Sequence, residues 1–210
     1  MQTVSIHQQS FTLLPEKAIY WHETNALLVS DLHLGKATHF RKHGIQAPSN
    51  LGLKDLLVLH KLLEQTQASR LFIIGDLFHS ELNHEWYLFE DFMKQHIGIA
   101  FILIRGNHDL LPAYLLKQAN LKTYLQYEEN GILLNHKPVQ KQGVYVICGH
   151  IHPGVLLQGK AKQTLRLPCF YFGPQHAILP AFGNFTGLAL LEPNAGDHVF
   201  VIADGRVIEL

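Results

Sequence analysis

Several side chains that can bind metals or move protons stand directly after apolar stretches of the chain. They are Asp31 and His33 after ALLVS, Asp76 after LFIIG, Asn107, His108 and Asp109 after AFILIRG, His136 after GILLN, and His150 and His152 after VYVICG. Carboxylates, amides and imidazoles all carry lone pairs, and imidazoles also exchange protons near neutral pH. Five apolar stretches that end in the same way predict one shared site.

Each of these residues has an ordinary explanation when it is taken alone. An Asp after a strand commonly forms a turn or a helix cap, and a lone histidine such as His136 commonly packs in the core. The pair His150 and His152 is compatible with packing, acid–base chemistry or metal binding. The coincidence favours a common function, because ligands of α/β sheets bind at the carboxyl ends of the strands.

The donor set indicates metal chemistry. With His108 set aside, it holds two carboxylates, one amide and four imidazoles, which is more than one ion takes. Such a set suits two ions that share a bridging carboxylate, about 3.5–4 Å apart. A mixed nitrogen and oxygen set without sulfur favours Mn, Fe or Zn over Mg or Ca. The 15 histidines among 210 residues are a mild indication in the same direction.

The elements that must position these residues follow from hydrophobic periodicity. Leucines at helical spacing predict a helix over 53–65, and an amphipathic pattern predicts another over 84–96. LPAYLLKQA predicts a short helix, and the loop LGKATHFRKHGI has helical potential. Continuous apolar runs predict strands, and beyond about residue 155 the pattern is strand and turn only, with a hairpin at ADG.

Continuously apolar strands imply sheets that are covered on both faces. We therefore expect an α/β fold, a four-layer α-β-β-α sandwich of two mixed sheets. No repeat, low-complexity segment or long linker divides the chain, so residues 1–210 are expected to form a single domain.

Composition narrows the class of protein. Apolar residues make up 47% and charged residues 16%, which is ordinary for a globular protein. The 17 basic residues balance the 17 acidic ones, so any phosphate binding must be local. Two cysteines form no disulfide framework, and no signal-peptide pattern or apolar run of membrane-spanning length is found. We expect a cytoplasmic protein without a membrane partner.

The motifs together resemble those of the calcineurin-like metallophosphoesterases. The blocks are DLH at 31–33, GD at 75–76, RGNHD at 105–109, NH at 135–136 and GHIH at 149–152. The fourth block departs from the family, which often has His-Gly where this chain has His136-Lys137. The resemblance implies a first ion held by Asp31, His33 and His152, a second held by Asn107, His136 and His150, and a bridge formed by Asp76.

The same resemblance implies roles for the two residues that follow Asn107. His108 would bind the phosphate and protonate the leaving oxygen without ligating a metal, and Asp109 would orient its ring. A hydroxide formed at the ions would attack phosphorus in line.

The stretch SDLHLGKATHFRKHGIQAP and the segment RLPCF resemble a narrower bacterial group, the ligase-associated DNA-damage-response phosphoesterases called PdeM. This resemblance implies two divalent ions, with Mn²⁺ favoured over Fe and Zn. It also implies DNA as the substrate, with endonuclease or end-processing activity in DNA repair. An ATP-dependent DNA ligase and a helicase would be its functional partners.

Substrate-binding residues are expected beside the first metal ligands. Residues 34–54 carry Lys36, Arg41 and Lys42 and no acidic residue, which suits a phosphate backbone as well as an ordinary solvated helix face. Arg105 could clamp a phosphate, or form an ion pair under the site. Phe40 could stack on a base, although a core position is the simpler expectation.

Two other functions remain open from the sequence. The same chemistry could act on a nucleotide or another small phosphodiester, or the chain could be an inactive scaffold of the same fold. The scaffold is disfavoured because every ligand position and the catalytic histidine are kept. Seven further histidines are expected at the surface or in packing: His7, His22, His60, His79, His84, His96 and His198.

Overall fold

The computed structural model describes residues 1–42, 44, 51–79, 84–159 and 163–210, and its first seven strands form one sheet. In spatial order they are β1 (Gln2–Ile6), β2 (Gln9–Leu14), β3 (Ala18–Trp21), β4 (Ala26–Ser30), β5 (Arg70–Ile74), β6 (Ala100–Ile104) and β7 (Lys122–Tyr124). The first four strands pair antiparallel, whereas β4 to β7 pair in parallel.

The remaining strands form the second sheet, which is also mixed. They are β8 (Gln126–Glu129), β9 (Ile132–Asn135), β10 (Tyr145–Cys148), β11 (Pro153–Gln158), β12 (Thr164–Phe172), β13 (His176–Ile178), β14 (Ala189–Leu190), β15 (His198–Ala203) and β16 (Arg206–Glu209). Strand β10 pairs in parallel with both β9 and β13, and β15 and β16 form the hairpin predicted at ADG.

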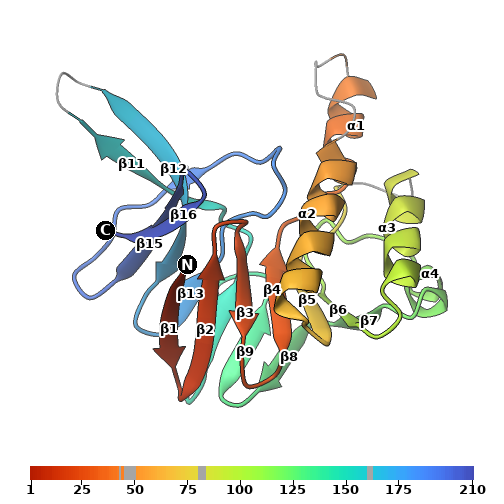
Figure 1. The fold of residues 1–210 in the computed structure, drawn as a ribbon, viewed down its shortest axis with the longest axis horizontal. Helices are drawn as coiled ribbons and strands as arrows, with labels where there is room; N and C mark the ends of the chain where they lie inside the picture. The colour runs from red at the N-terminus through yellow and green to blue at the C-terminus, as the bar shows by residue number, and fades with distance from the viewer. Residues whose placement is uncertain (43, 45–50, 80–83, 160–162) are drawn as a thin grey trace.

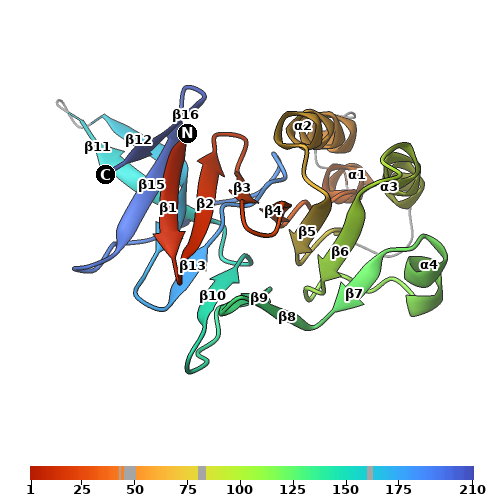
Figure 2. The same cartoon turned by 60° about the horizontal axis from the view of Figure 1, so that its bottom comes forward.

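The helices of the described residues lie beside the first sheet (Figures 1 and 2). They are α1 (Lys36–Lys42), α2 (Leu51–Thr66), α3 (His84–Gln95) and α4 (Ala113–Gln118). Leucines of α2 and aromatic residues of α3 pack on one face of β4, β5 and β6, for example Leu59 and Phe89 around Ile73. None of these helices combines the length and apolar character that a membrane span requires.

A second apolar core fills the space between the two sheets. It joins Trp21, Phe72 and Ile104 of the first sheet to Ile147 and Phe170 of the second. The predicted α/β fold of two packed mixed sheets is therefore confirmed.

The outer face of the second sheet differs from the expected helical layer. In the described part of the chain it carries a third apolar cluster, in which Cys148 and Cys169 are fully buried. Loop and strand residues such as Val139, Ile151 and Leu191 pack against that cluster in place of a helix. The sequence after β10 explains this, because its apolar residues fall in strands separated by turns and carry no helical repeat long enough to cover a sheet.

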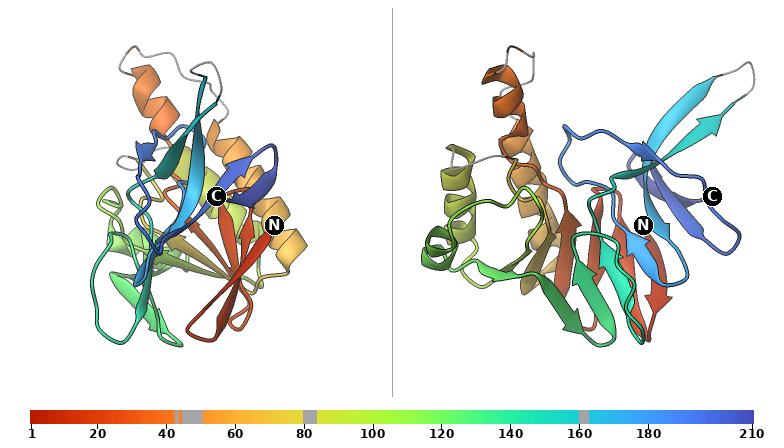
Figure 3. Two further views of the ribbon diagram at one scale, coloured as in Figure 1. Left: turned by 90° about the vertical axis from the view of Figure 1, so that its left-hand side faces the viewer. Right: turned by 180° about the vertical axis from the view of Figure 1, so that it is seen from behind.

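The site depends on parallel strands that end at one edge. Strands β4, β5 and β6 of the first sheet and β9 and β10 of the second deliver their carboxyl ends toward each other. Residues 179–183 cross between the two sheets, since Leu179 N–H donates to Cys148 O and Phe182 N–H donates to Ser30 O. Helix α1 and the β11–β12 hairpin extend from the same side of the sandwich (Figures 1 and 3).

Candidate active site

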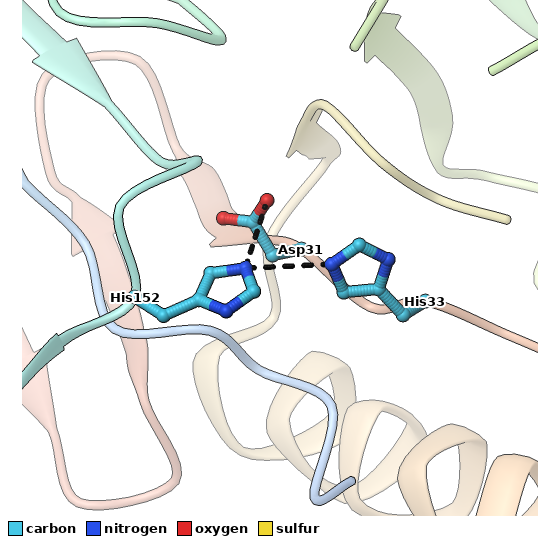
Figure 4. A group of neighbouring side chains, drawn as sticks. All are labelled: Asp31, His33 and His152. Atoms are coloured by element: carbon cyan, nitrogen blue, oxygen red, sulfur yellow. Dashed lines mark hydrogen bonds and ion pairs between the residues drawn. The ribbon is translucent and has the colours of Figure 1, made fainter. Parts of the chain in front are cut away.

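The structure brings the predicted ligands together in two groups of three. Asp31, His33 and His152 form one group, and Asp76, His136 and His150 form the other. In each group the candidate ligand atoms lie within 4.8 Å of one another. Figure 4 shows the first group, in which His152 Nε2 points toward both the Asp31 carboxylate and the His33 ring. This grouping coincides with the division of ligands that the motifs imply.

The two buried carboxylates connect these groups. Asp76 Oδ2 lies 3.9 Å from His33 Nε2, and Asp76 Oδ1 lies 3.5 Å from His136 Nε2. Asp31 Oδ1 likewise lies 3.5 Å from His152 Nε2 and 4.0 Å from His136 Nδ1. The amide oxygen of Asn107 lies 3.1 Å from His136 Nε2, which places it beside the second group. Asp76 thus faces a histidine of each group, as a bridging ligand would.

These side chains fit divalent cations. Asp31 Oδ1 is fully buried and accepts no hydrogen bond from the described residues, and such a buried charge is costly unless a partner compensates it. Pairs of imidazole nitrogens also face each other, at 3.4 Å between His33 and His152 and at 3.0 Å between His136 and His150. A cation beside such a pair would accept a lone pair from each nitrogen, and nitrogen with oxygen donors suits transition metals.

Left-handed backbone recurs at the ligand positions. Five of them are non-glycine residues with φ between 48° and 68°: Asp31, His33, Asp76, His150 and His152. This conformation costs roughly 1–3 kcal/mol per residue where it is strained, and such residues gather at functional sites. Here it turns the chain sharply after β4, β5 and β10, so that successive ligands point to the same place.

Glycines in the motifs allow backbone and ligands to approach closely. A Cβ at Gly149 would overlap Asp31 Oδ2 and the Ser30 side chain, and a Cβ at Gly106 would overlap the Asp76 carboxylate. Both positions therefore need a residue without a side chain, for reasons of space rather than of φ. The glycines of the Gly-Asn-His and Gly-His motifs thus leave space for the carboxylates of Asp76 and Asp31.

The electrostatics favour ionised carboxylates and neutral imidazoles. Burial alone would raise the pKa of Asp31, but the neighbouring His152 and His136 and the His150 N–H lower it below its ordinary value. Burial lowers the pKa of His33 to about 3, and Lys36 and the neighbouring histidines add to that effect. Both states are those in which these side chains bind metals.

Asp109 has a different set of partners from the one expected. Its carboxylate accepts hydrogen bonds from the backbone N–H groups of Leu77 (2.9 Å), Phe78 (3.4 Å) and Gly106 (2.7 Å). In the described residues these bonds join the loops after β5 and β6, and none of them reaches the His108 ring. Burial and the nearby Asp76 raise the pKa of Asp109, against the effect of these N–H groups.

The basic residues that were predicted to bind the substrate differ in their exposure and in their contacts. Lys36 is half-buried, and the charges of Asp31 and Asp76 act on its ammonium group. Arg41 Nη2 donates to Thr38 Oγ1 within α1, at 2.8 Å. Arg105 is exposed, and its Nη2 donates to the carbonyl of Asp109 at 2.9 Å. The side chain of Lys42 lies outside the described residues.

The structure adds one residue to the site that the sequence placed in packing or at the surface. The ring of His79 stacks on that of His108, with centroids 5.2 Å apart and planes at 25°. Its Nδ1 is buried without a hydrogen-bond partner among the described residues, and burial, together with Lys36 and His108, lowers its pKa to about 4. The only sequence signal was its position three residues after Asp76.

This fold and this cluster of ligands define a class of protein. The calcineurin-like phosphoesterase family model matches residues 24–162, and the chain belongs to this family. It is a metal-dependent phosphoesterase with two candidate metal-binding groups.

Among solved structures, the chain is similar to the nuclease MPE of Pseudomonas putida, with 32% identity and a TM-score of 0.86. That match covers 100% of this chain and 99% of the other, and it agrees with the resemblance to the PdeM group. The phosphoesterase Yfce of E. coli matches at 15% identity with a TM-score of 0.44, over 88% of this chain and 97% of the other. No curated protein sequence matches the chain.

Replacing Asp76 by Asn should release both ions. The amide keeps the shape but removes the charge that faces a histidine of each group. We expect fewer than one Mn per chain by elemental analysis, under conditions that load the wild type with two. Asp91→Asn, at an exposed carboxylate of α3, is the matched control. An Asp76→Asn protein that keeps two ions would contradict the shared role.

Gly149→Ala should weaken metal binding while the fold is kept. The new methyl group would push against the Asp31 carboxylate, and changing a residue that orients a metal ligand typically costs about 10–100-fold in metal affinity. Titration calorimetry with Mn²⁺ measures the change. Gly98→Ala, where an added Cβ meets nothing within 4 Å, is the control. Equal affinities for the wild type and Gly149→Ala would show that the close approach is unimportant.

Proposed function

We propose that this chain is a dimetal phosphodiesterase that cleaves DNA. The observation that carries the proposal is the pair of ligand groups that Asp76 faces, with exposed Arg105 and Lys137 beside the second group and half-buried Lys36 beside the first. Asp31, His33 and His152 would hold one ion, Asn107, His136 and His150 the other, and Asp76 both. When bound, such ions lower the pKa of a bound water and neutralise charge on the phosphate oxygens.

The protein's own side chains would perform the remaining tasks. His108 lies beside the first group, with its ring centroid 5.7 Å from that of His33. Its backbone N–H donates to Asp76 Oδ1 at 2.9 Å, which ties its position to the bridging carboxylate. We assign His108 as the general acid that protonates the leaving oxygen. Asp109 is a positioning residue that holds the loops after β5 and β6 together.

Two observations support a polymeric substrate. First, Asn107, Arg105 and Lys137 are exposed, and they line an open depression of about 730 Å³ that reaches His136. Second, Lys36 lies beside the first group, where it lines a depression together with His33. A strand that crosses the site would meet positive charge before and after the scissile phosphate. The likeness to a nuclease over the whole chain favours DNA in particular.

A nucleotide or another small phosphodiester is the second candidate substrate. It is favoured only by the chemistry of the ligand groups, which any phosphodiester would satisfy.

We further propose Mn²⁺ as the native metal and a cytoplasmic role in DNA repair, beside an ATP-dependent DNA ligase and a helicase. The nitrogen-rich ligand set supports Mn, Fe or Zn over Mg.

His108→Ala should abolish turnover without loss of metal. Removing a general acid typically costs about 10²–10⁴ in rate, whereas the ring is not one of the proposed ligands. Single-turnover cleavage of a labelled oligonucleotide, with the metal content measured on the same sample, separates the two effects. His198→Ala, at an exposed strand position, is the control. A variant that loses metal together with activity would make His108 a ligand.

DNA as substrate predicts a steep salt dependence. The rate should be compared across DNA, a dinucleotide, cyclic nucleotides and a generic diester in Mn²⁺. For DNA, replacing Lys36 and Lys137 by Gln should reduce the slope of log(kcat/KM) against log[salt] by about 1.4–1.8, because each phosphate contact contributes about 0.7–0.9. Lys61→Gln, on the exposed face of α2, should leave the slope unchanged. Cleavage of small diesters only, without salt dependence, would refute DNA.

A further inference from the structure

Two phenylalanines outside the apolar cores pack edge to face beside the ligand groups. Phe40 of α1 and Phe185 of the loop after β13 have ring centroids 5.5 Å apart and planes at 79°. Neither belongs to the three apolar clusters of the described residues, and both are only half-buried. We call the pair the aromatic platform. It borders a surface depression of about 330 Å³ that is lined by Lys36, Phe40, Asn184, Phe185, Thr186 and Gly187.

A continuous column of rings leads from the platform to the proposed general acid. The planes of Phe40 and His79 meet at 16°, with centroids 6.3 Å apart. His79 then stacks on His108, at 25° and 5.2 Å. The faces of these rings are therefore nearly parallel from the rim of the depression to the reacting centre. A planar group that stacks on the Phe40 ring would extend this series of nearly parallel rings.

Lys36 connects the depression to the ligand groups. Its side chain lines the depression, and the charges of Asp31 and Asp76 also act on it. A ligand with a planar group on the platform and a phosphate over these carboxylates would therefore meet Lys36 between its two parts. A nucleotide unit has this combination of a flat ring and a neighbouring phosphate.

The loop that carries Phe185 is fixed by hydrogen bonds to α2 and to Lys17. Asp55 of α2 is buried, and its Oδ1 accepts a hydrogen bond from Asn184 Nδ2 at 2.6 Å. Lys17 Nζ donates to Asn184 Oδ1 at 3.3 Å, and Thr186 Oγ1 donates to Gly183 O at 3.0 Å. The segment after β13 reaches across to α2 in Figures 1 and 2. A rigid loop that presents an aromatic ring outside the core is suited to binding.

We propose that the aromatic platform is a nucleobase subsite, in which one base of the substrate strand stacks while its phosphate lies at the ligand groups. This proposal rests on the proposed function, since it assumes a nucleic acid substrate. Every base has a flat π face, so a stacking platform holds a base whatever its identity. The platform would position the scissile phosphate relative to His108.

The same contacts predict weak preference among bases. Both polar atoms of the Asn184 amide are engaged by Asp55 and Lys17, and the Thr186 hydroxyl donates to Gly183 O. These groups are thus committed to holding the loop rather than to reading the edge of a base. Recognition at the platform would come from ring stacking and from the charge of Lys36 on the phosphate.

The experiment combines ring removal with base removal. Phe40→Leu and Phe185→Leu keep apolar volume but remove the ring, and Phe185→Trp restores a stacking face. Tyr87→Leu, at an exposed aromatic residue of α3, is the control. Each protein cleaves a set of oligonucleotides in Mn²⁺, in which a single abasic residue replaces one base at successive positions around the cleavage site. Metal content and melting temperature are measured alongside.

We expect the wild type to lose about fivefold or more in kcat/KM at one abasic position, because stacking of one base is worth about 1–3 kcal/mol. The two Leu variants should lose as much on intact DNA, show no further loss at that position, and keep two ions. Phe185→Trp should keep the wild-type kcat/KM on intact DNA and the loss of kcat/KM at that abasic position. A wild type that cleaves DNA while the Leu variants match it would overturn the subsite alone. A wild type that cleaves only small diesters would overturn the proposed function and the subsite with it.

Discussion

The buried Asp31 carboxylate is the interaction on which the site depends. It stands at the end of β4 in the first sheet, yet its partners come from the second, since His150 N–H donates to Oδ2 and the rings of His136 and His152 face Oδ1. A carboxylate that is fully buried is costly unless opposite charge and hydrogen bonds surround it. Correct docking of the two sheets and correct assembly of the ligand groups are therefore the same event.

The conformational strain that comes with this assembly of the ligand groups is concentrated at the strand ends. Left-handed residues at Asp31, Asp76 and His150 and close glycine contacts at Gly149 and Gly106 lie where β4, β5, β6 and β10 meet. The large apolar core between the sheets offsets this local strain. Cations held between the imidazoles would further stabilise the folded state, because the unfolded chain has no preformed site. Metal binding and folding would thus be coupled.

The sequence predicted what depends on local pattern. Polar residues after apolar runs identified the strand ends and the side chains that meet there, whereas the division of these side chains into two groups came from the resemblance to a known family. Strands β1, β7 and β8 were not foreseen, because they are mostly exposed. Strand β11 was also missed, although its first three residues are buried. Contacts between distant segments were equally out of reach. The stacking of His79 on His108 and the backbone partners of Asp109 depend on how two loops meet in space.

Selection among phosphoesters must come from outside the ligand groups, because those groups recognise only the phosphate that all such substrates share. The chain offers two flanking regions with different chemistry. Arg105 and Lys137 present charge beside His136, whereas the opposite side combines Lys36 with the aromatic platform. Charge alone binds a backbone in any register, but a ring that stacks on one base fixes which phosphate lies at the centre. That asymmetry would convert general affinity for a strand into a defined position of the bond that is cut.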